Sequence, residues 1–406
     1  MYIKRKLEGK ILKYLNSPEI IAVIGPRQCG KSTMLQRILS KLENVAMVNF
    51  EDRSALSMFN KNIDDFIALY VENKKYLFID EFQYAKKGGK KLKYIFDSHK
   101  IKIFISGSSA IDMTVNALKF LVGRIFIFPL QPLDFAEFLS YKDKAYAGML
   151  EKENTIFKQL GNSQVGEDAD EKLKQYYQEY VLYGGYPRVV TSRDDEEKKE
   201  VLKNIYNTYF LREVRDILGL IDDYKLEKLI KALALQIGNL IEYGELGNVS
   251  EFSYPTLKKY LNFLEKTFIC GLVKPYYENK RTEIVKNPKV YFFDSGLRNS
   301  IINDFRKFED RVDKGQLLEN AVFMQLIKGG YEFNFWRDKK KNELDFILQL
   351  PNQKKLALEV KSTFKNSQST SILSFKKTYP EIDVAFLFLK ATVAFKNTKA
   401  YPIWIV

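Results

Sequence analysis

Histidine, cysteine and long apolar runs are scarce in this sequence of 406 residues. Because His99 is the only histidine, histidine-based catalytic triads, histidine zinc clusters and imidazole acid–base catalysis are excluded everywhere except at that position. Two cysteines, Cys29 and Cys270, are too few for a disulfide framework, and residues 1–19 are too charged for a secretion signal. No apolar run approaches the about 20 residues that a membrane-spanning helix requires. Carboxylates, lysines and bound metal must carry any reaction, and we expect a cytoplasmic protein without membrane contact.

The remaining composition is that of a globular, basic protein. Hydrophobic residues make up 46% of the chain and aromatic residues 14%, and its length predicts three or four units of roughly 100 to 150 residues each. The formal net charge is +14, and residues 286–406 hold 21 Lys and Arg against 13 Asp and Glu. Such a charge attracts nucleic acid, the commonest polyanion, but a generally lysine-rich composition explains it equally well.

A phosphate-binding loop follows the first apolar run. Residues 20–24 predict a buried parallel strand, which leads directly into the pattern G-x-x-x-x-G-K-S at 25–32. Two glycines let successive backbone N–H groups face the phosphates, the lysine offsets their charge, and the helical periodicity of 33–39 points a helix N-terminus at the same anion. The pattern predicts an ATP site made of Gly25, Pro26, Arg27, Gln28, Cys29, Gly30, Lys31, Ser32 and Thr33.

Two further strands are expected to end near this loop. The apolar residues 76–79 run into Asp80 and Glu81, so Asp80 would hold Mg²⁺ through water beside Ser32, while Glu81 would polarise the attacking water. The alternative is a strand that ends in two solvated acids. Residues 101–105 predict a third strand, after which Ser108 or Ser109 either senses the γ-phosphate or is an ordinary turn residue.

Several segments together resemble the AAA-type ATPases of archaea and bacteria in which an ATPase core precedes a domain of unknown function. The matching segments are GPRQCGKS at 25–32, YLFIDEFQ at 76–83, FISGSS at 104–109, LVGRIFIFPLQPLDFAEF at 121–138 and YGGYPRVV at 183–190. The resemblance implies a sensor or finger role for Arg124, in cis or from a neighbouring subunit, and the second case implies a homo-oligomer. A structural salt bridge is the competing interpretation of Arg124.

The middle of the chain is predicted to be helical. Residues 132–224 favour helices that would close on the nucleotide as a lid, with a flexible loop at 161–166. Residues 253–264 predict the second helix of a helix-turn-helix, and 269–273 with 280–284 predict a β-hairpin wing, so a winged helix is expected. This unit holds 8 Lys and Arg against 7 Asp and Glu, so DNA contact and a purely structural packing role both stay open.

The C-terminal part combines a helix, expected at 315–326, with several strands. Asp345 is followed 14 residues later by Glu359, and the alternation of a strand places Glu359 and Lys361 on one face. This pattern resembles the PD-(D/E)xK nuclease superfamily, and Glu319 falls where that superfamily has an additional helix carboxylate. Leu344 stands where the superfamily pattern has proline, although that proline is often absent.

The nuclease resemblance implies a second metal site. Asp345, Glu359 and Glu319 would bind Mg²⁺ or Mn²⁺, and Lys361 would orient the attacking water or stabilise the phosphorane. Lys339, Lys340 and Lys341 would lie near the nucleic-acid backbone. The competing interpretation is an inactive nuclease fold used for docking.

The sequence therefore predicts an α/β protein with a P-loop NTPase (AAA-type) core, a helical lid, a winged-helix middle domain and an α/β nuclease-like C-terminal domain. The expected ranges are 1–140 for the core, 141–225 for the lid or linker, 226–285 for the winged-helix-like domain and 286–406 for the nuclease-like domain. The predicted function is ATP binding and hydrolysis coupled to a DNA-interacting C-terminal domain. The alternatives are a nucleotide-gated scaffold that cuts nothing and a DNA-stimulated motor without cleavage.

Overall fold

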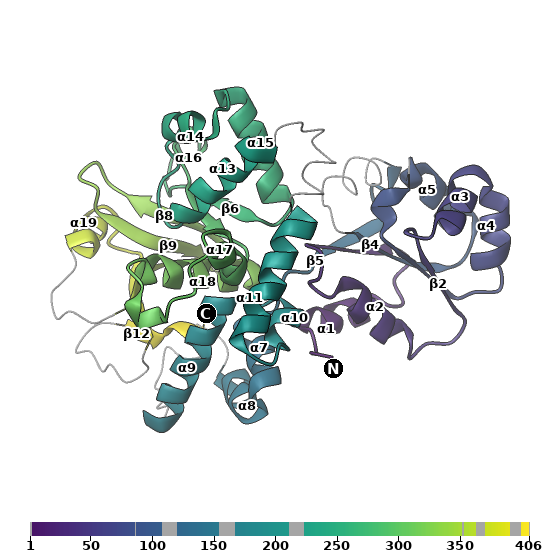
Figure 1. Ribbon diagram of the computed structural model, residues 1–406, viewed down its shortest axis with the longest axis horizontal. Coiled ribbons are helices and arrows are strands. Elements are labelled where there is room, and N and C mark those ends of the chain that lie inside the picture. Colours follow the sequence, from purple (N-terminus) through teal and green to yellow (C-terminus); the bar gives the residue numbers. More distant parts are fainter. Residues whose placement is uncertain are drawn as a thin grey trace. The chain divides into compact units, whose positions relative to one another are not determined.

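The computed structural model divides the chain into two compact units (Figure 1). The first contains Met1–Pro132 with Asn262–Phe268, and the second contains Leu133–Leu261 and Ile269–Val406. The structure describes residues 2–85, 87–107, 120–153, 167–210, 223–350, 353–362, 370–389 and 399–405.

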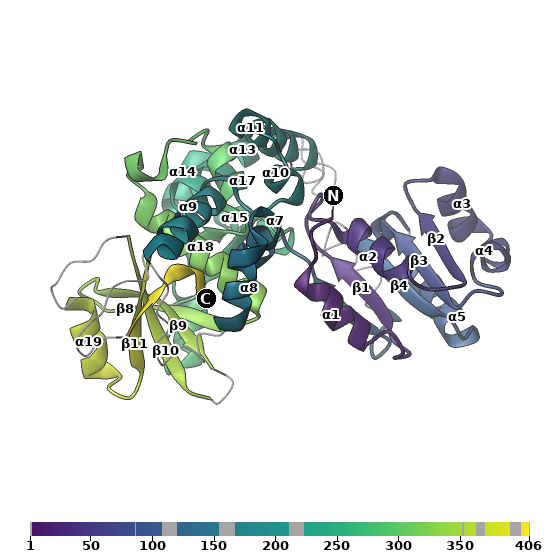
Figure 2. The same ribbon diagram turned by 90° about the horizontal axis from the view of Figure 1, so that it is seen from below.

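A parallel five-stranded sheet forms the centre of the first unit. Its strands are β1 (Ile20–Ile24), β2 (Val45–Asn49), β3 (Tyr76–Asp80), β4 (Lys102–Gly107) and β5 (Ile125–Pro129), in the order β2-β3-β4-β1-β5. All adjacent pairs are parallel, so the carboxyl ends of the five strands lie at one edge (Figure 2). The three strands expected around 20–24, 76–79 and 101–105 are confirmed.

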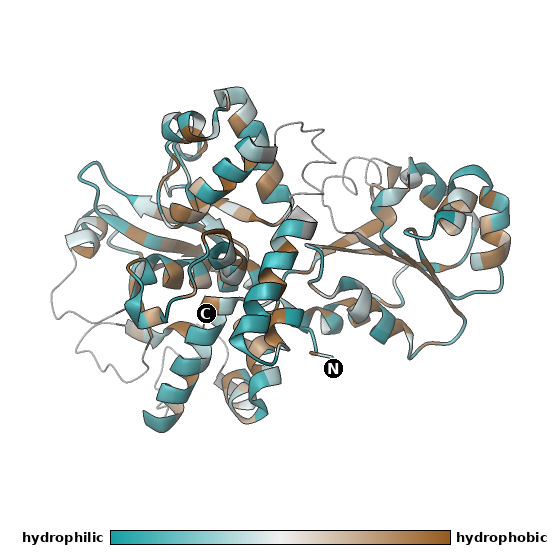
Figure 3. Ribbon diagram, in the orientation of Figure 1, coloured by the Kyte–Doolittle hydropathy of each residue, from teal (hydrophilic) through white to brown (hydrophobic). Residues whose placement is uncertain are grey.

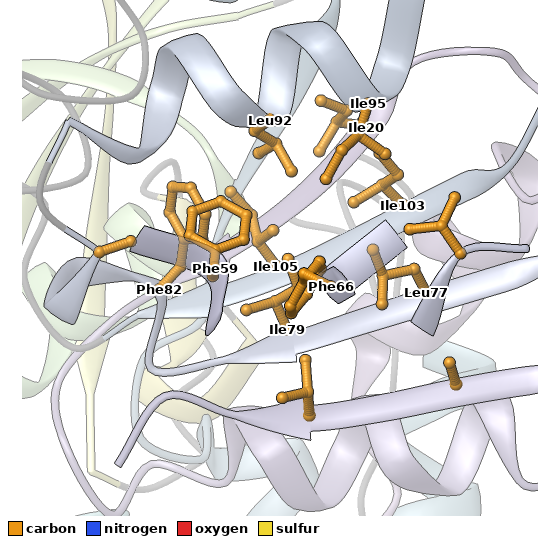
Figure 4. Packing of buried hydrophobic residues seen from close by; sticks show 14 of the residues in the cluster. Ile20, Phe59, Phe66, Leu77, Ile79, Phe82, Leu92, Ile95, Ile103 and Ile105 are labelled. Atoms are coloured by element: carbon orange, nitrogen blue, oxygen red, sulfur yellow. The ribbon is translucent and has the colours of Figure 1, made fainter. Parts of the chain in front are cut away.

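Helices cover both faces of this sheet because its strands alternate between two buried layers. On β1, Ile20 and Ala22 pack into one core while Ile21 and Val23 pack into the other. The helices are α1 (Lys6–Lys13), α2 (Lys31–Leu39), α3 (Arg53–Lys61), α4 (Ile63–Tyr70) and α5 (Gly88–Ser98), with a 3₁₀ turn η1 at Phe82–Tyr84. Figure 4 shows the core that α3, α4 and α5 cover. The strands are hydrophobic along most of their length (Figure 3). The three central strands β1, β3 and β4 are buried, as expected for strands covered on two sides, whereas Met47 of β2 and Ile127 of β5 are exposed at the sheet edges.

The second unit begins with helices. These are α7 (Phe135–Lys142), α8 (Lys144–Glu153), α9 (Glu167–Tyr183), α10 (Pro187–Val190), α11 (Asp195–Asn204) and the π-helical segment η3 (Ile205–Phe210). The helical prediction for 132–224 is confirmed for the described residues, while the loop expected at 161–166 lies outside them. The predicted boundary after residue 140 falls inside α7.

The segment YGGYP at 183–187 has a structural explanation. Gly184 has a φ of 75°, and a Cβ there would lie 2.1 Å from Asp294 Oδ1. Asp294 accepts hydrogen bonds from the backbone N–H of Gly185 (2.8 Å) and of Leu297 (2.9 Å), so it caps α17 (Ser295–Ile301) and holds the glycine turn at once.

The helix expected at 253–264 is present, but the β-hairpin wing expected from 269–273 and 280–284 is not formed, because 280–284 is helical. The helices here are α13 (Asp223–Leu235), α14 (Tyr243–Ser250) and α15 (Tyr254–Lys266), the last of which confirms the helix expected at 253–264. Strand β6 (Cys270–Val273) pairs antiparallel with β7 (Lys289–Phe292), whereas residues 280–284 lie in helix α16 (Lys280–Val285). Asn279 caps that helix by accepting from the N–H of Arg281 at 3.0 Å, which favours a helix over a strand.

A mixed sheet forms the end of the second unit. After the 3₁₀ turn η4 (Phe308–Asp310) come α18 (Lys314–Gly329), β8 (Glu332–Arg337), β9 (Glu343–Gln349), β10 (Lys355–Lys361), α19 (Thr370–Thr378), β11 (Asp383–Phe388), β12 (Lys399–Pro402) and η5 (Ile403–Ile405). Strands β8, β9 and β10 form an antiparallel meander, and β11 and β12 continue the sheet in parallel with β10. None of the helices in the described part of the chain is long and apolar enough to cross a membrane.

Candidate nucleotide and carboxylate sites

The loop after β1 is shaped by its two glycines. A Cβ on Gly25 would lie 1.9 Å from the carbonyl oxygen of Leu130, so the loop passes the chain beyond β5 at a distance that only glycine permits. Gly30 has a φ of 94° and directly precedes α2, whose N-terminus therefore opens onto the loop. The predicted strand, loop and helix are all present.

Lys31 folds back onto this loop. Its Nζ donates to the carbonyl oxygens of Gly25 (3.0 Å) and Pro26 (2.8 Å), and the residue is only 5% exposed. Both acceptors are neutral, so they satisfy the hydrogen bonds of the ammonium without cancelling its charge. A positive charge held inside a loop of backbone amides favours an anion at this place.

Three donors converge on one oxygen of Asp80. The hydroxyl of Ser32 donates to Oδ1 at 2.9 Å, the hydroxyl of Ser106 donates to the same oxygen, and the N–H of Glu81 lies 3.1 Å from it. These residues begin α2 or stand at the ends of β3 and β4, so the sheet edge gathers them. Ser106 is the third-strand hydroxyl that reaches the site, and the predicted Ser108 and its neighbour Ser109 lie outside the described residues.

Glu81 stands in a strained backbone conformation beside this cluster. Its φ of 53° and ψ of 44° are left-handed, which costs a residue with a side chain about 1 to 3 kcal/mol and is common at functional sites. The side-chain amide of Gln83 donates to the Glu81 carboxylate. Glu81 therefore lies at the sheet edge next to Asp80, where the sequence places it. Its carboxylate accepts the hydrogen bond from Gln83.

Other loop residues lie around the same edge. Gln28 is exposed with a left-handed φ of 59°, and Thr33 is exposed in the first turn of α2. Arg27 Nη2 donates to the phenol oxygen of Tyr84 at 2.9 Å. Arg27 thus contacts Tyr84, whereas Gln28 and Thr33 are exposed.

A buried arginine, Arg5, which the sequence pattern does not reveal, holds the backbone of the loop by hydrogen bonds. Arg5 Nη1 donates to the carbonyl of Cys29 (2.7 Å) and Nη2 to that of Gln131 (2.6 Å). The Cys29 side chain is fully buried and its Sγ lies 3.3 Å from the carbonyl oxygen of Leu130, so Cys29 can offer only its backbone to a nucleotide. No local pattern marks Arg5, because its partners lie 24 and 126 residues away.

Arg124 does not lie at the nucleotide edge, which corrects the prediction of a role in cis. Strand β5 runs parallel to β1 with Ile125 opposite Ile20, so Arg124 precedes the amino end of the sheet while the loop follows its carboxyl end. A strand of five residues separates the two edges by about 16 Å. Arg124 Nε instead forms an ion pair with Asp97 Oδ1 at 2.8 Å, which supports the salt-bridge interpretation.

In the C-terminal sheet, the predicted Asp345, Glu359 and Lys361 come together. The register of β9 and β10 pairs Phe346 with Leu358, which places Asp345 and Glu359 next along the two strands. Asp345 Oδ2 accepts the N–H of Val360 at 2.7 Å, and Lys361 Nζ lies 2.6 Å from Glu359 Oε1. The side chain of Lys361 is 45% exposed and that of Glu359 is 5% exposed, so the ion pair joins a buried acid to a lysine at the surface.

Glu319 of α18 joins this cluster through two residues that the sequence analysis did not single out. The phenol of Tyr291 donates to Glu319 Oε2 at 3.2 Å, and Lys289 Nζ lies 3.8 Å from the same oxygen. Lys289 Nζ is also 2.5 Å from Glu343 Oε1. Lys289 and Tyr291 both lie on β7, two residues apart, which is the spacing of one face of a strand.

The acids of this cluster resist ionisation. Burial, with a further contribution from Asp345, raises the pKa of Glu319 to about 8 and that of Glu359 to about 7. Burial also raises the pKa of Asp345, although Lys289 and the N–H of Val360 oppose the shift. Burial alone would lower the pKa of Lys289, but Glu319, Asp345 and Glu343 raise it instead.

The carboxylate oxygens of this cluster are the ligands that a hard divalent cation prefers, but they are not close enough together to bind one. Glu359 Oε2 is buried without a hydrogen-bond partner, which is an acceptor that a cation would satisfy. Among the residues that the structure describes, no three His, Cys, Asp or Glu side chains are already gathered as a metal site. The three acids Glu319, Asp345 and Glu359 would therefore have to move closer to share an ion. In the structure, Lys289 and Lys361 balance part of their negative charge.

Comparison with known proteins agrees with a chain built from successive parts. Residues 17–139 match the family model of an AAA domain, while 174–307 and 314–406 each match the model of a domain of unknown function. A protein of Haemophilus influenzae described as uncharacterized is 26% identical over 405 residues, covering 94% of this chain and 93% of its own. An uncharacterized protein of Methanocaldococcus jannaschii is 26% identical over 403 residues, covering 96% of this chain and 84% of its own.

Likeness to solved structures is distant. The Walker-type ATPase of Pyrococcus abyssi has a TM-score of 0.44 at 15% identity, with 74% of this chain and 96% of that chain covered. The ORC1 protein of Aeropyrum pernix, solved in complex with DNA, has a TM-score of 0.33 at 11% identity, with coverage of 75% and 93%.

The first unit is a P-loop NTPase domain. A buried parallel strand, a glycine loop with Lys31, and a helix whose Ser32 contacts the acid at the end of β3 define that class. Residues 17–139 resemble an AAA domain, since they match the family model of that description.

Proposed function

We propose that this protein binds ATP in its first unit and hydrolyses it with Mg²⁺. The observation that carries the proposal is the contact between Ser32 and Asp80 beside the buried ammonium of Lys31. Lys31 would neutralise phosphate charge, Ser32 would hold Mg²⁺ directly and Asp80 through water, and Glu81 would polarise the attacking water. The metal would supply additional neutralisation of the phosphate oxygens.

Phosphate release from Mg-ATP tests this proposal. Lys31→Ala should lower the rate by about 100-fold or more, because it removes a preorganised charge from the transition state. Lys41→Ala is a suitable control, since Lys41 is an exposed lysine just beyond α2. Equal rates in the parent and in Lys31→Ala would show that the site is wrongly assigned.

For the second unit we propose a nuclease-like site that acts on DNA, with the helices between α7 and α11 responding to the nucleotide state. Support comes from Asp345, Glu359 and Lys361 lying together, as the D and E-x-K pattern requires. Asp345, Glu359 and Glu319 would hold Mg²⁺ or Mn²⁺, which would stabilise charge on the phosphate, and Lys361 would orient the attacking water. Lys339, Lys340 and Lys341 are exposed between β8 and β9, where they would attract the nucleic-acid backbone.

One observation favours a second candidate, a nucleotide-gated scaffold that cuts nothing. The acids are not gathered for a metal within the described residues, and Lys361 is engaged by Glu359. Linear, circular and branched DNA incubated with Mg²⁺ or Mn²⁺ separates the candidates. Product that disappears in Asp345→Ala and Lys361→Ala supports the nuclease, no product favours the scaffold, and ATP hydrolysis that DNA stimulates without any cleavage favours a motor.

A homo-oligomer is proposed for one reason only. Arg124 lies at the sheet edge opposite the loop, so its guanidinium could serve a nucleotide only in a neighbouring subunit. Gel filtration with and without ATP tests this directly. A species that stays monomeric in both conditions leaves Arg124 with its ion pair to Asp97 alone.

A further inference from the structure

The 3₁₀ turn η1 carries a side chain that contacts the carboxylate of Glu81. The side-chain amide of Gln83 donates to Oε2 of Glu81, two residues earlier in the chain. No residue in the described part of the chain donates a hydrogen bond to the other oxygen, Oε1. One oxygen of the carboxylate is therefore held by an amide, while the second keeps its capacity to accept a hydrogen bond from water.

The backbone of Glu81 is fixed more closely than its side chain. Its N–H lies 3.1 Å from Asp80 Oδ1, and its left-handed φ of 53° and ψ of 44° set the direction in which the side chain leaves the strand end. Several rotatable bonds still separate that backbone from the carboxylate, and a glutamate side chain loses considerable rotamer freedom when it is held in one orientation. The hydrogen bond from Gln83 limits these rotations.

Gln83 stands on a turn that is itself held in place. Phe82 is buried in the core of the first unit, and a Cβ on Gly88 would lie 2.9 Å from its ring, so the start of α5 packs closely on the turn. The phenol oxygen of Tyr84 accepts a hydrogen bond from Arg27 of the glycine loop at 2.9 Å. The contacts of this turn therefore include both Glu81 and the loop that carries Lys31.

We propose that Gln83 is a positioning residue for ATP hydrolysis: its amide holds the Glu81 carboxylate in the orientation from which Oε1 accepts a hydrogen bond from the attacking water. The inference rests on the proposed ATPase function. An amide donor is neutral, so it orients the carboxylate without cancelling the negative charge that polarises water. Gln83 acts through Glu81 in this role and contacts neither the water nor the nucleotide.

ATP hydrolysis and fluorescent-nucleotide titration of the full chain test this together. Gln83→Met keeps the length of the side chain and removes the donor, so ATP affinity should stay that of the parent. Its kcat should fall by at least about 10-fold, because misplacing a reacting group by about 1 Å can cost about 100-fold. Gln83→Glu should lower kcat further, since a second carboxylate repels Glu81. Gln36→Met, at an exposed position of α2, is the matched control and should hydrolyse ATP as the parent does.

A second background separates a positioning role from a structural one. In Glu81→Gln, the additional change Gln83→Met should cost no further activity, because the group that it positions is already lost. Parental or faster turnover in Gln83→Met would overturn the inference, and so would an equal loss in both backgrounds or a matching loss of ATP affinity. A parent chain that hydrolyses no ATP, or that loses no activity in Glu81→Gln, would overturn the proposed role of Glu81 together with the inference.

Discussion

Ser32 donates its hydroxyl to Asp80 Oδ1 across 2.9 Å, which joins the first turn of α2 to the end of β3. The two residues are 48 positions apart in the chain, and the parallel order of the sheet brings them to one edge. This contact brings Glu81, the residue after Asp80, to the same sheet edge as the loop.

Glu81→Gln should separate nucleotide binding from hydrolysis. The amide keeps the size of the carboxylate but cannot polarise water as a base, so we expect ATP affinity close to that of the parent and a rate lower by about 100-fold. Fluorescent-nucleotide titration and phosphate release measure the two quantities. Glu72→Gln, at an exposed position, serves as the control, and parental turnover in Glu81→Gln would rule out its assigned role.

Gly25→Ala should damage the loop. The added methyl would stand 1.9 Å from the Leu130 carbonyl oxygen, which is backbone and cannot swing away, so the loop must shift. We expect ATP affinity to fall by at least about 10-fold, equivalent to about 1.4 kcal/mol. Gly9→Ala in α1 is the matched control, because nothing lies within 4 Å of the place that its methyl group would take and binding should be unchanged. Normal ATP binding by Gly25→Ala would contradict the close approach.

Arg124→Ala should leave nucleotide binding by a single subunit intact. Its partner is Asp97 at the far edge of the sheet, and a half-exposed ion pair of this kind contributes about 0 to 1 kcal/mol to the free energy of unfolding. Urea denaturation and ATP titration at low protein concentration check both expectations. If dilute Arg124→Ala loses ATP affinity, the position assigned to Arg124 is wrong.

The acids of the C-terminal cluster predict how stability depends on pH without metal. Glu319 and Glu359 have a pKa of 4.5 when exposed, raised to about 8 and about 7 in the folded chain, so the folded state binds more protons than the unfolded state in between. Their stabilising contribution is complete below about pH 4.5 and is lost as the pH rises towards about 8. The slope should flatten in the double variant Glu319→Gln with Glu359→Gln. Denaturation midpoints in EDTA from pH 5 to 8.5 check this, and parallel pH profiles for parent and variant would refute it.

Local patterns were sufficient to predict the strand, the loop and the helix around Lys31. A buried apolar run, a glycine loop and a helix predict β1, the loop and α2 from residues close in sequence, and Asp80 follows from the end of a second apolar run. The position of Arg124 was beyond such reasoning, because the edge on which it lies depends on how β5 pairs with β1. Arg5 was missed for a similar reason, since its partners are distant in the chain.

In the middle and C-terminal regions, too, local patterns predicted some residues, whereas others depend on contacts between distant parts of the chain. The pattern of Asp345, Glu359 and Lys361 was readable because strand alternation fixes the face of each residue, whereas the wing at 280–284 failed because the Asn279 cap favours a helix. The sequence around Lys289 does not predict that it is buried, because a lysine in an apolar strand can equally lie on the surface. Only the contacts of Lys289 with Glu319 of α18 and Glu343 of β9 reveal its carboxylate partners.

Titration of the purified chain with Mg-ATP in a calorimeter tests the central claim most directly, because every role assigned to the first unit requires a triphosphate at the loop that carries Lys31. The structure predicts saturable heat from a nucleotide site in the parent and its loss in Lys31→Ala. Absence of heat with both Mg-ATP and Mg-GTP in a folded parent chain would contradict the account.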